Sequence, residues 1–288
     1  MLTQAMRISG HKVAKGTNIN APTLADHSLE LYEFLGESYL KLDMCRGDDM
    51  DIIVKETTRY SQGCSILDAG CGPGRHVEHC SQLQSVQEVE GIDFSTTMIA
   101  AARKHTYDSP RKASVSLRVH DLLEPIIDIT PFDIVLCLNN VLGNVISKDI
   151  DTATDDRKRF LQNMYTYMSP SGRIVLSVYM RSFMPPECAH GSDNGFRLLD
   201  SSNCQTGDLI IAYTPAPSLK FQYYSHWFTK EELTDLLSES GFNTLHVIER
   251  SPRLIVICQA TDSRRSHVDK VSQFRASPKS ELDYKGLW

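Results

Sequence analysis

The stretch Ile66-Leu67-Asp68-Ala69-Gly70-Cys71-Gly72-Pro73-Gly74 decides the fold of this chain, because an apolar run ends in an acidic residue and then a glycine-rich turn. Such a turn is typical of the first strand-to-helix connection of a doubly wound α/β sheet, where the backbone meets a nucleotide-bearing cofactor. Glycine permits the tight turn, and its missing Cβ lets the ligand approach the main chain. The third glycine comes one residue earlier than in the dinucleotide pattern G-x-G-x-x-G, so the turn departs from that fingerprint.

Strand-like and helix-like segments alternate around this turn. Hydrophobic patterning predicts strands over 65–69, 88–93, 115–119, 132–138 and 173–179, and helices over 26–44, 50–60, 75–83, 95–105 and 157–168. Ser95 is the expected N-cap of its helix, and Ser169-Pro170-Ser171-Gly172 is a stop signal for the helix before it. This βαβ alternation predicts a parallel sheet that is covered on both faces.

The pattern changes after Arg181. Short strand-like runs at 196–200, 209–213 and 219–228 predict an antiparallel insertion, interpreted as a cap over the cofactor cleft. Regular α/β patterning returns with a helix from Thr229, which forms a capping box with Glu232, and with two strands over 243–249 and 253–259. The expected organisation is an N-terminal helical lid segment (1–60), a cofactor-binding core (61–180), the cap (181–228), the C-terminal part of the core sheet (229–260) and a polar tail (261–288).

Composition excludes several classes of function. The chain has 288 residues, 41% of them hydrophobic and 23% charged, as in an ordinary globular protein. A net charge of −6 and the lack of a dense Lys/Arg run argue against a nucleic-acid partner. The apolar runs are too short to span a bilayer and no signal peptide is apparent, so a cytoplasmic protein without membrane association is expected.

The cysteines and histidines do not predict a metal site. Eight cysteines are scattered without a C-x-x-C pair, and are expected to be reduced thiols. His76, His79 and Cys80 are close in sequence, but a structural zinc site usually needs a fourth, well-spaced ligand. A helix that exposes its polar residues explains the same spacing, and no metal is predicted.

The acidic residue and the glycine spacing together resemble motif I of the class I methyltransferases that use S-adenosylmethionine. The resemblance covers about residues 60–180 and, more loosely, extends to 260. It implies a doubly wound, mostly parallel seven-stranded sheet, the Rossmann-like methyltransferase fold of the α/β class, with N-terminal helices and the antiparallel cap insertion. It also implies S-adenosylmethionine as the cofactor.

The resemblance assigns roles to residues that follow successive strands. Asp93 is expected to accept hydrogen bonds from the ribose hydroxyls, and Asp121 to accept from the adenine amino group, with Met98 and Leu122 beside the ring. Any one of these residues alone is weak support, since a strand-end Asp is often only a turn former. Their order along the chain is what indicates a cofactor site. The full predicted set of cofactor-binding residues is Asp68, Gly70, Cys71, Gly72, Gly74, Asp93, Phe94, Met98, Asp121, Leu122 and Asn139.

The segment Leu136–Gly143 is similar to the corresponding part of the glycine and sarcosine N-methyltransferases. That likeness implies that Asn140 and Arg181 hold a substrate carboxylate, although the residues around Arg181 depart from the glycine enzyme's pattern. Tyr224 is also predicted to bind the substrate. His226 is the predicted general base, with a histidine satisfied on an alternating strand as the alternative. Tyr32 is predicted to close over the cleft and face the sulfonium, with a core residue as the alternative.

Three functions remain open at this stage. The first is an N-methyltransferase acting on a small amine, amino acid or peptide amine. The second is an O-methyltransferase acting on a small-molecule carboxylate or hydroxyl, and the third is a non-catalytic cofactor-binding partner subunit. Nucleic-acid amino-methyltransferases carry a proline-proline-aromatic motif where this chain has Asn139-Asn140-Val141-Leu142, which argues against that subfamily. The acidic cluster of metal-dependent catechol enzymes and the acidic double loop of protein arginine methyltransferases are not apparent either. The methyl acceptor and the oligomeric state are not predicted.

Overall fold

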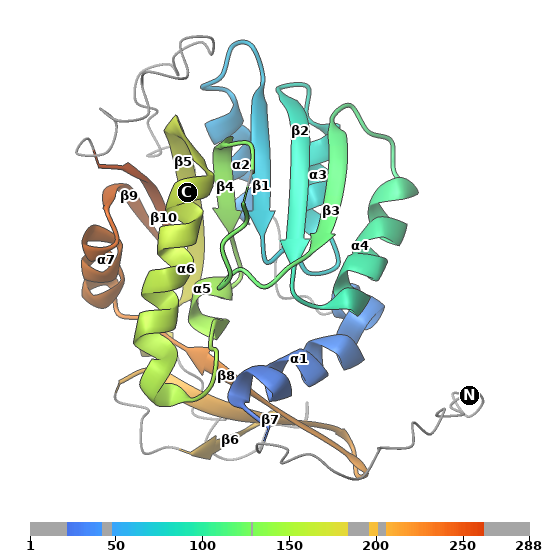
Figure 1. Cartoon of the computed structure of the whole chain (residues 1–288), viewed down its shortest axis with the longest axis vertical. Helices are drawn as coiled ribbons and strands as arrows, with labels where there is room; N and C mark the ends of the chain where they lie inside the picture. The colour runs from blue at the N-terminus through green and yellow to red at the C-terminus, as the bar shows by residue number, and fades with distance from the viewer. Residues whose placement is uncertain (1–21, 42–47, 128, 184–195, 201–205, 262–288) are drawn as a thin grey trace.

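A seven-stranded sheet forms the centre of the protein (Figure 1). The computed structural model describes residues 22–41, 48–127, 129–183, 196–200 and 206–261. In spatial order the strands are β3 (Ser114–Val119), β2 (Val86–Asp93), β1 (Cys64–Ala69), β4 (Phe132–Cys137), β5 (Met168–Tyr179), β10 (Arg253–Ala260) and β9 (Phe242–Arg250). Strands β1 to β5 are parallel, whereas β10 is antiparallel to both β5 and β9. The predicted mostly parallel seven-stranded sheet is confirmed.

Helices cover both faces of this sheet. One face packs against α2 (Asp48–Thr57), α3 (Arg75–Gln82) and α4 (Thr96–Tyr107), and the other against α6 (Ala153–Tyr167) and α7 (Lys230–Glu239). Successive strand residues alternate between the two cores, as Ile66 lies in the cluster with α3 and Leu67 in the cluster with α6. Both are fully buried, as expected for a parallel sheet between two helical layers.

The predicted antiparallel insertion is a second sheet of three strands, β6 (Phe196–Asp200), β7 (Asp208–Ala216) and β8 (Leu219–His226). We call it the cap sheet. Helix α1 (Leu24–Leu35) lies between the cap sheet and the core (Figure 1). Its Leu31 and Leu35 share an apolar cluster with Phe221 of β8 and Met98 of α4. The cap sheet and α1 therefore enclose the space beyond the carboxyl ends of the core strands.

The predicted N-terminal helix over 26–44 is wrong in its extent. Helix α1 ends at Leu35 because Gly36 adopts a positive φ of 40°, and a 3-10 helix, η1 (Gly36–Lys41), follows. The apolar spacing continues through this break, which is why the sequence indicates one long helix. Residues 42–44 of the predicted helix lie outside the described residues.

The expected stop signal before β5 is partly correct. Helix α6 ends at Tyr167, but β5 begins already at Met168 instead of at Arg173. The first part of β5 is irregular, since its pairing with β4 shifts between Phe132 and Ile134. A Cβ at Gly172 would lie 2.9 Å from the carbonyl oxygen of Phe132, so only glycine fits this close strand approach.

Two predicted helix caps are confirmed. The Ser95 side chain accepts a hydrogen bond from Met98 N at the start of α4, and Thr229 forms a capping box with Glu232 at the start of α7. The predicted polar tail covers residues 261–288, and all of these except Thr261 lie outside the described residues. No helix in the described part of the chain combines the length and the apolar character needed to cross a bilayer.

Candidate active site

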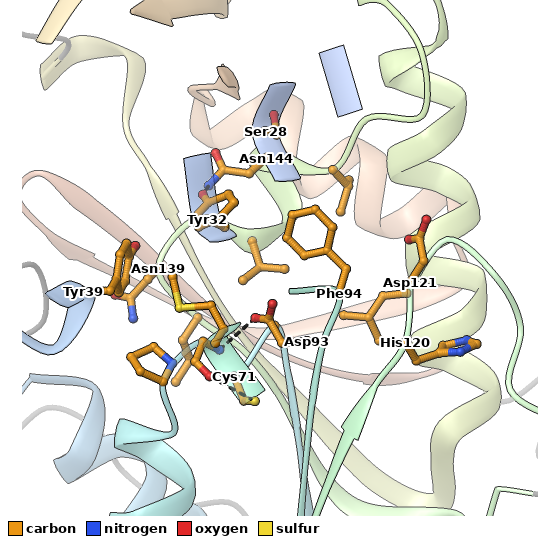
Figure 2. Close-up of a pocket in the computed structure, with 18 of the residues that line it drawn as sticks. Ser28, Tyr32, Tyr39, Cys71, Asp93, Phe94, His120, Asp121, Asn139 and Asn144 are labelled. Atoms are coloured by element: carbon orange, nitrogen blue, oxygen red, sulfur yellow. Dashed lines mark hydrogen bonds between the residues drawn. The ribbon is translucent and has the colours of Figure 1, made fainter. Parts of the chain in front are cut away.

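A pocket opens beside the glycine turn, at the carboxyl ends of β1, β2 and β4 (Figure 2). It contains about 1120 Å³ of space free of protein atoms, part of which is open to solvent. Ligands of open α/β sheets bind at this edge, where the order of the strands reverses. The predicted site residues that line it are Tyr32, Gly70, Cys71, Gly72, Asp93, Phe94, Met98, Asp121, Leu122 and Asn139.

A side chain at each of the three glycines of the turn would meet different surroundings. All three adopt a positive φ, 78° at Gly70, 52° at Gly72 and 84° at Gly74. A Cβ at Gly70 would lie 2.5 Å from a methyl carbon of Val141, and one at Gly74 would lie 2.9 Å from the Cβ of Ala102. At Gly72 a Cβ would meet no protein atom within 4 Å. Gly70 and Gly74 thus serve packing, whereas Gly72 leaves bare backbone facing the pocket.

Asp93 joins the glycine turn to the second strand. Its Oδ2 accepts a hydrogen bond from Gly72 N at 2.8 Å, and its Oδ1 accepts from Ser95 N at 3.0 Å. Burial raises the pKa of Asp93 to about 6, against the lowering effect of these backbone hydrogen bonds. Each oxygen keeps further acceptor capacity, and the side chain lines the pocket. The carboxylate is therefore placed to accept hydroxyl groups of a ligand.

Asp68 lies behind the turn rather than on the pocket wall. It is almost fully buried, and its Oδ2 has no hydrogen-bond partner among the described residues. Burial, and then the nearby Asp93 carboxylate, raise the pKa of Asp68 to about 7. His76 Nδ1 is 4.0 Å from this oxygen, too far for a hydrogen bond, and burial lowers the pKa of His76 to about 3. Asp68 is thus an acceptor that the fold leaves unsatisfied, beside a neutral imidazole.

Two consecutive asparagines follow β4 in the left-handed region, with φ of 57° at Asn139 and 64° at Asn140. Asn139 lines the pocket, and its Oδ1 accepts from Arg253 Nη1 at 3.4 Å. Asn140 is fully buried and does not line the pocket. Its side chain connects β5, the cap sheet and the short helix α5 (Val141–Asn144). Its contact with a substrate carboxylate stays a prediction.

His226 is buried in a charged network outside the pocket. Its Nδ1 is 2.7 Å from Asp208 Oδ1 and its Nε2 is 2.7 Å from Glu232 Oε1, and the side chain is 1% exposed. Both ring nitrogens are therefore occupied by carboxylates. This placement favours the alternative of a histidine satisfied within the fold, and the role of His226 as a general base stays a prediction.

Arg181 and Tyr224 belong to the same network. Arg181 pairs with Glu232 and donates from Nε to the Trp227 carbonyl oxygen at 3.1 Å. Tyr224 is fully buried and donates its hydroxyl to Asp208. Neither residue lines the pocket, and the substrate contacts of both stay predictions. Both residues lie at the cap sheet or next to it, and their side chains connect it to the core through Glu232 of α7 and Arg157 of α6.

Sequence reasoning missed several pocket residues. Ser28 and Asn144 line the side formed by α1 and α5, and His120 lines the pocket as well (Figure 2). His76 also lines the pocket. Ser28 precedes Tyr32 by four residues on α1, the spacing that puts two side chains on one helix face, so this signal was present in the sequence. The sequence gave no signal for Asn144, because α5 is a single turn and is too short for hydrophobic patterning to detect. No group of three or more potential metal-ligating side chains occurs among residues 22–261 where the structure describes them.

The pocket has features that fit S-adenosylmethionine. The open face at Gly72 suits close ligand approach, and the remaining acceptor capacity of Asp93 suits ribose hydroxyls. Behind the turn, the unsatisfied Asp68 oxygen suits an ammonium group that reaches past the pocket wall. Met98 and Leu122 add apolar walls near Asp121, as an adenine ring requires. These individual roles stay predictions.

Residues 66–172 match the family model of the methyltransferase domain. The chain is 24% identical over 204 residues to a dTDP-4-amino-2,3,4,6-tetradeoxy-D-glucose N,N-dimethyltransferase of Saccharopolyspora spinosa, covering 66% of this chain and 76% of that protein. It is 27% identical over 120 residues to a phosphoethanolamine N-methyltransferase of Triticum aestivum, covering 42% of this chain but only 21% of that protein.

The fold is that of solved methyltransferases. The structure of the DhpI–SAH complex superposes with a TM-score of 0.59 at 19% sequence identity, covering 83% of this chain and 98% of that one. The domain match, the superposition and the glycine turn beside its pocket agree with one another. Residues 66–172 are therefore a methyltransferase domain, and the chain has the fold of the class I S-adenosylmethionine-dependent methyltransferases.

Proposed function

We propose that the enzyme transfers the methyl group of S-adenosylmethionine to the nitrogen of a small amine. When bound, the cofactor supplies an electrophilic methyl group on a sulfonium, so the protein needs mainly to position a nucleophile and exclude water. Asp68, the backbone at Gly72, Asp93 and Asp121 would hold the cofactor on the glycine-turn side of the pocket. The acceptor would then enter the side lined by α1 and α5 (Figure 2).

The observation that carries this proposal is the chemistry of that second side. Its polar side chains are Ser28, Tyr32 and Asn144. Burial, with the nearby Asp93 carboxylate, raises the pKa of Tyr32 well above its usual value, so the phenol stays protonated. A serine hydroxyl and an amide do not act as bases by themselves. A neutral amine needs no base to attack a sulfonium, whereas a hydroxyl usually benefits from one.

The relatives support nitrogen as the acceptor atom. The two curated proteins described above are named as N-methyltransferases, one acting on an amino sugar and the other on phosphoethanolamine. Both names describe an acceptor that carries an amine. At 24% and 27% identity these relatives support the kind of reaction.

The test is a methylation assay with the full chain, deuteromethyl S-adenosylmethionine and a set of small amines, with products identified by mass spectrometry. We expect N-methylated products, and an increase in rate with pH as the amine loses its proton. Products methylated only on oxygen would contradict the proposal. The Gly72→Ala variant serves as the control with an obstructed cofactor turn.

A further inference from the structure

A directed chain of hydrogen bonds ends at the hydroxyl of Tyr32 in the pocket. Asn140 Oδ1 accepts from the backbone N–H of Tyr179 at 3.1 Å, and Asn140 Nδ2 donates to Asn144 Oδ1 at 3.2 Å. Asn144 Nδ2 then donates to the Tyr32 hydroxyl oxygen at 3.1 Å. Figure 2 shows Asn144 beside Tyr32 on the pocket wall. Helix α1, helix α5 and the core sheet thus share one chain of hydrogen bonds.

Two backbone groups fix the direction of this chain. A backbone N–H can only donate, so the Tyr179 N–H requires the oxygen of the Asn140 amide on its side. A backbone carbonyl can only accept, and that of His226 takes a hydrogen bond from Asn140 Nδ2 at 3.2 Å. The Asn140 amide therefore has one orientation. Its Nδ2 has two hydrogens and three acceptors in reach, the His226 carbonyl oxygen, Ser225 Oγ at 3.0 Å and Asn144 Oδ1. Since two amide NH2 groups would repel each other at 3.2 Å, the oxygen of Asn144 faces Asn140, which turns Asn144 Nδ2 toward Tyr32.

The consequence is that the Tyr32 hydroxyl must donate elsewhere. Its oxygen already accepts from Asn144, and no residue in the described ranges accepts a hydrogen bond from its O–H. Tyr32 lines the pocket, and its raised pKa keeps the proton on the oxygen. The phenol therefore offers the pocket a donor.

A second hydroxyl points to a ligand at the same place. Ser28 lies one turn before Tyr32 on α1 and also lines the pocket. It is only 4% exposed, and its Oγ has no hydrogen-bond partner in the part of the chain that the structure describes. A buried hydroxyl without a partner is unfavourable unless a ligand or water completes it. Two hydroxyls on one helix face thus lack protein acceptors.

We propose that Asn144 is a positioning residue that fixes Tyr32 as a hydrogen-bond donor, and that the enzyme selects amines with an oxygen acceptor close to the nitrogen. The proposal rests on the function proposed above and narrows its substrate to amino alcohols and related oxygenated amines. A donor aimed at the amine lone pair would compete with attack on the methyl group, so the partner is a neighbouring oxygen. The carboxylate of the cofactor is the other source of an acceptor, and the test separates the two.

The experiment compares two amines that differ by one hydroxyl, trans-2-aminocyclohexanol and cyclohexylamine. For the wild-type enzyme we expect kcat/KM for the amino alcohol to be about tenfold higher or more, the scale of one hydrogen bond to a buried group. Tyr32→Phe removes the donor, and Asn144→Asp turns the Tyr32 O–H toward residue 144. Both variants are expected to lose the preference because they slow the amino alcohol more than they slow cyclohexylamine.

Binding measurements test the preference between the two amines even if the enzyme turns both over slowly. Both amines are titrated into the protein–SAH complex by calorimetry, where the same preference is expected for the wild type. A role of Tyr32 toward the cofactor would appear as weaker SAH binding by Tyr32→Phe, and that result would overturn the proposal. Equal rates and equal binding of the two amines by the wild type, including binding of neither, would overturn it as well.

The position of the methyl group separates this proposal from the proposed function. The amino alcohol offers both a nitrogen and an oxygen, and fragmentation of the product shows which is methylated. Methylation on oxygen with a preference that still depends on Tyr32 would refute amine methylation and support the donor role. Methylation on nitrogen with a preference that depends on neither Tyr32 nor Asn144 would support amine methylation and refute the donor role. Thermal melting of both variants confirms that each is folded.

Discussion

Substitution of Gly72 by alanine should separate the cofactor-facing part of the glycine turn from its packing. Gly72 has a φ of 52°, and an added Cβ would meet no protein atom within 4 Å. The free energy of unfolding should therefore decrease only by the cost of placing a Cβ in the left-handed region, about 1–2 kcal/mol. Since Gly72 lines the pocket, the new methyl group would occupy space that the ligand needs.

The chain offers a matched control for the backbone cost. Gly241 has a φ of 89°, and a Cβ there would lie 3.5 Å from the Tyr165 ring, an ordinary contact, far in sequence from the turn. Gly241→Ala should lose similar stability and keep its affinity for the cofactor. Gly72→Ala should bind SAH about 5- to 150-fold more weakly, from the roughly 1–3 kcal/mol that an overpacked methyl group costs.

Calorimetric titration of SAH and thermal melting of both variants give the two quantities. Unchanged SAH affinity in Gly72→Ala would refute the placement of the cofactor against this turn. Equal losses of affinity in Gly72→Ala and Gly241→Ala would show that backbone strain, and not contact with the ligand, explains the effect.

Three further outcomes are expected. Asp93→Ala should weaken SAH binding by about 1–3 kcal/mol, measured by calorimetry. Burial raises the pKa of Asp93 to about 6 and the ionised form is the better acceptor, so the SAH affinity of the wild type should decrease as pH falls through 6. The SAH affinity of the variant should depend less on pH. His226→Gln should lower the free energy of unfolding by about 3 kcal/mol in urea unfolding. The pH dependence of kcat should stay the same, whereas loss of a catalytic base would remove one limb of the pH profile of kcat. Gly74→Ala should destabilise by about 3 kcal/mol, since its Cβ would press on Ala102 at 2.9 Å in a left-handed backbone, and an unchanged urea midpoint would contradict that contact.

The side of the pocket next to the glycine turn could be predicted from the sequence because its residues follow strands in a fixed order. Gly70, Gly72, Asp93 and Asp121 all line the pocket, as the alternation of strands and helices required. Each stands at the carboxyl end of a parallel strand, and those ends meet at one edge of the sheet. Local patterning is sufficient for such a site.

The other half could not be predicted, because it depends on packing between distant segments. His226 and Tyr224 lie on a strand whose neighbours were unknown, so aromatic surroundings were compatible with either a pocket or a core. The contact between α1 and β8 and the single turn of α5 bring Tyr32 to Asn144, 112 residues apart in sequence. No periodicity encodes that approach.

The charged network around His226 determines how the molecule can open. It joins β7 through Asp208, β8 through His226 and α7 through Glu232, while Arg157 Nη1 of α6 lies 3.7 Å from Asp208 Oδ1. Separating the cap sheet from the core would break the Arg157–Asp208 and His226–Glu232 contacts together, so opening only one part of this boundary is unfavourable. The cap sheet and the core should therefore exchange their amide hydrogens as a single cooperative unit.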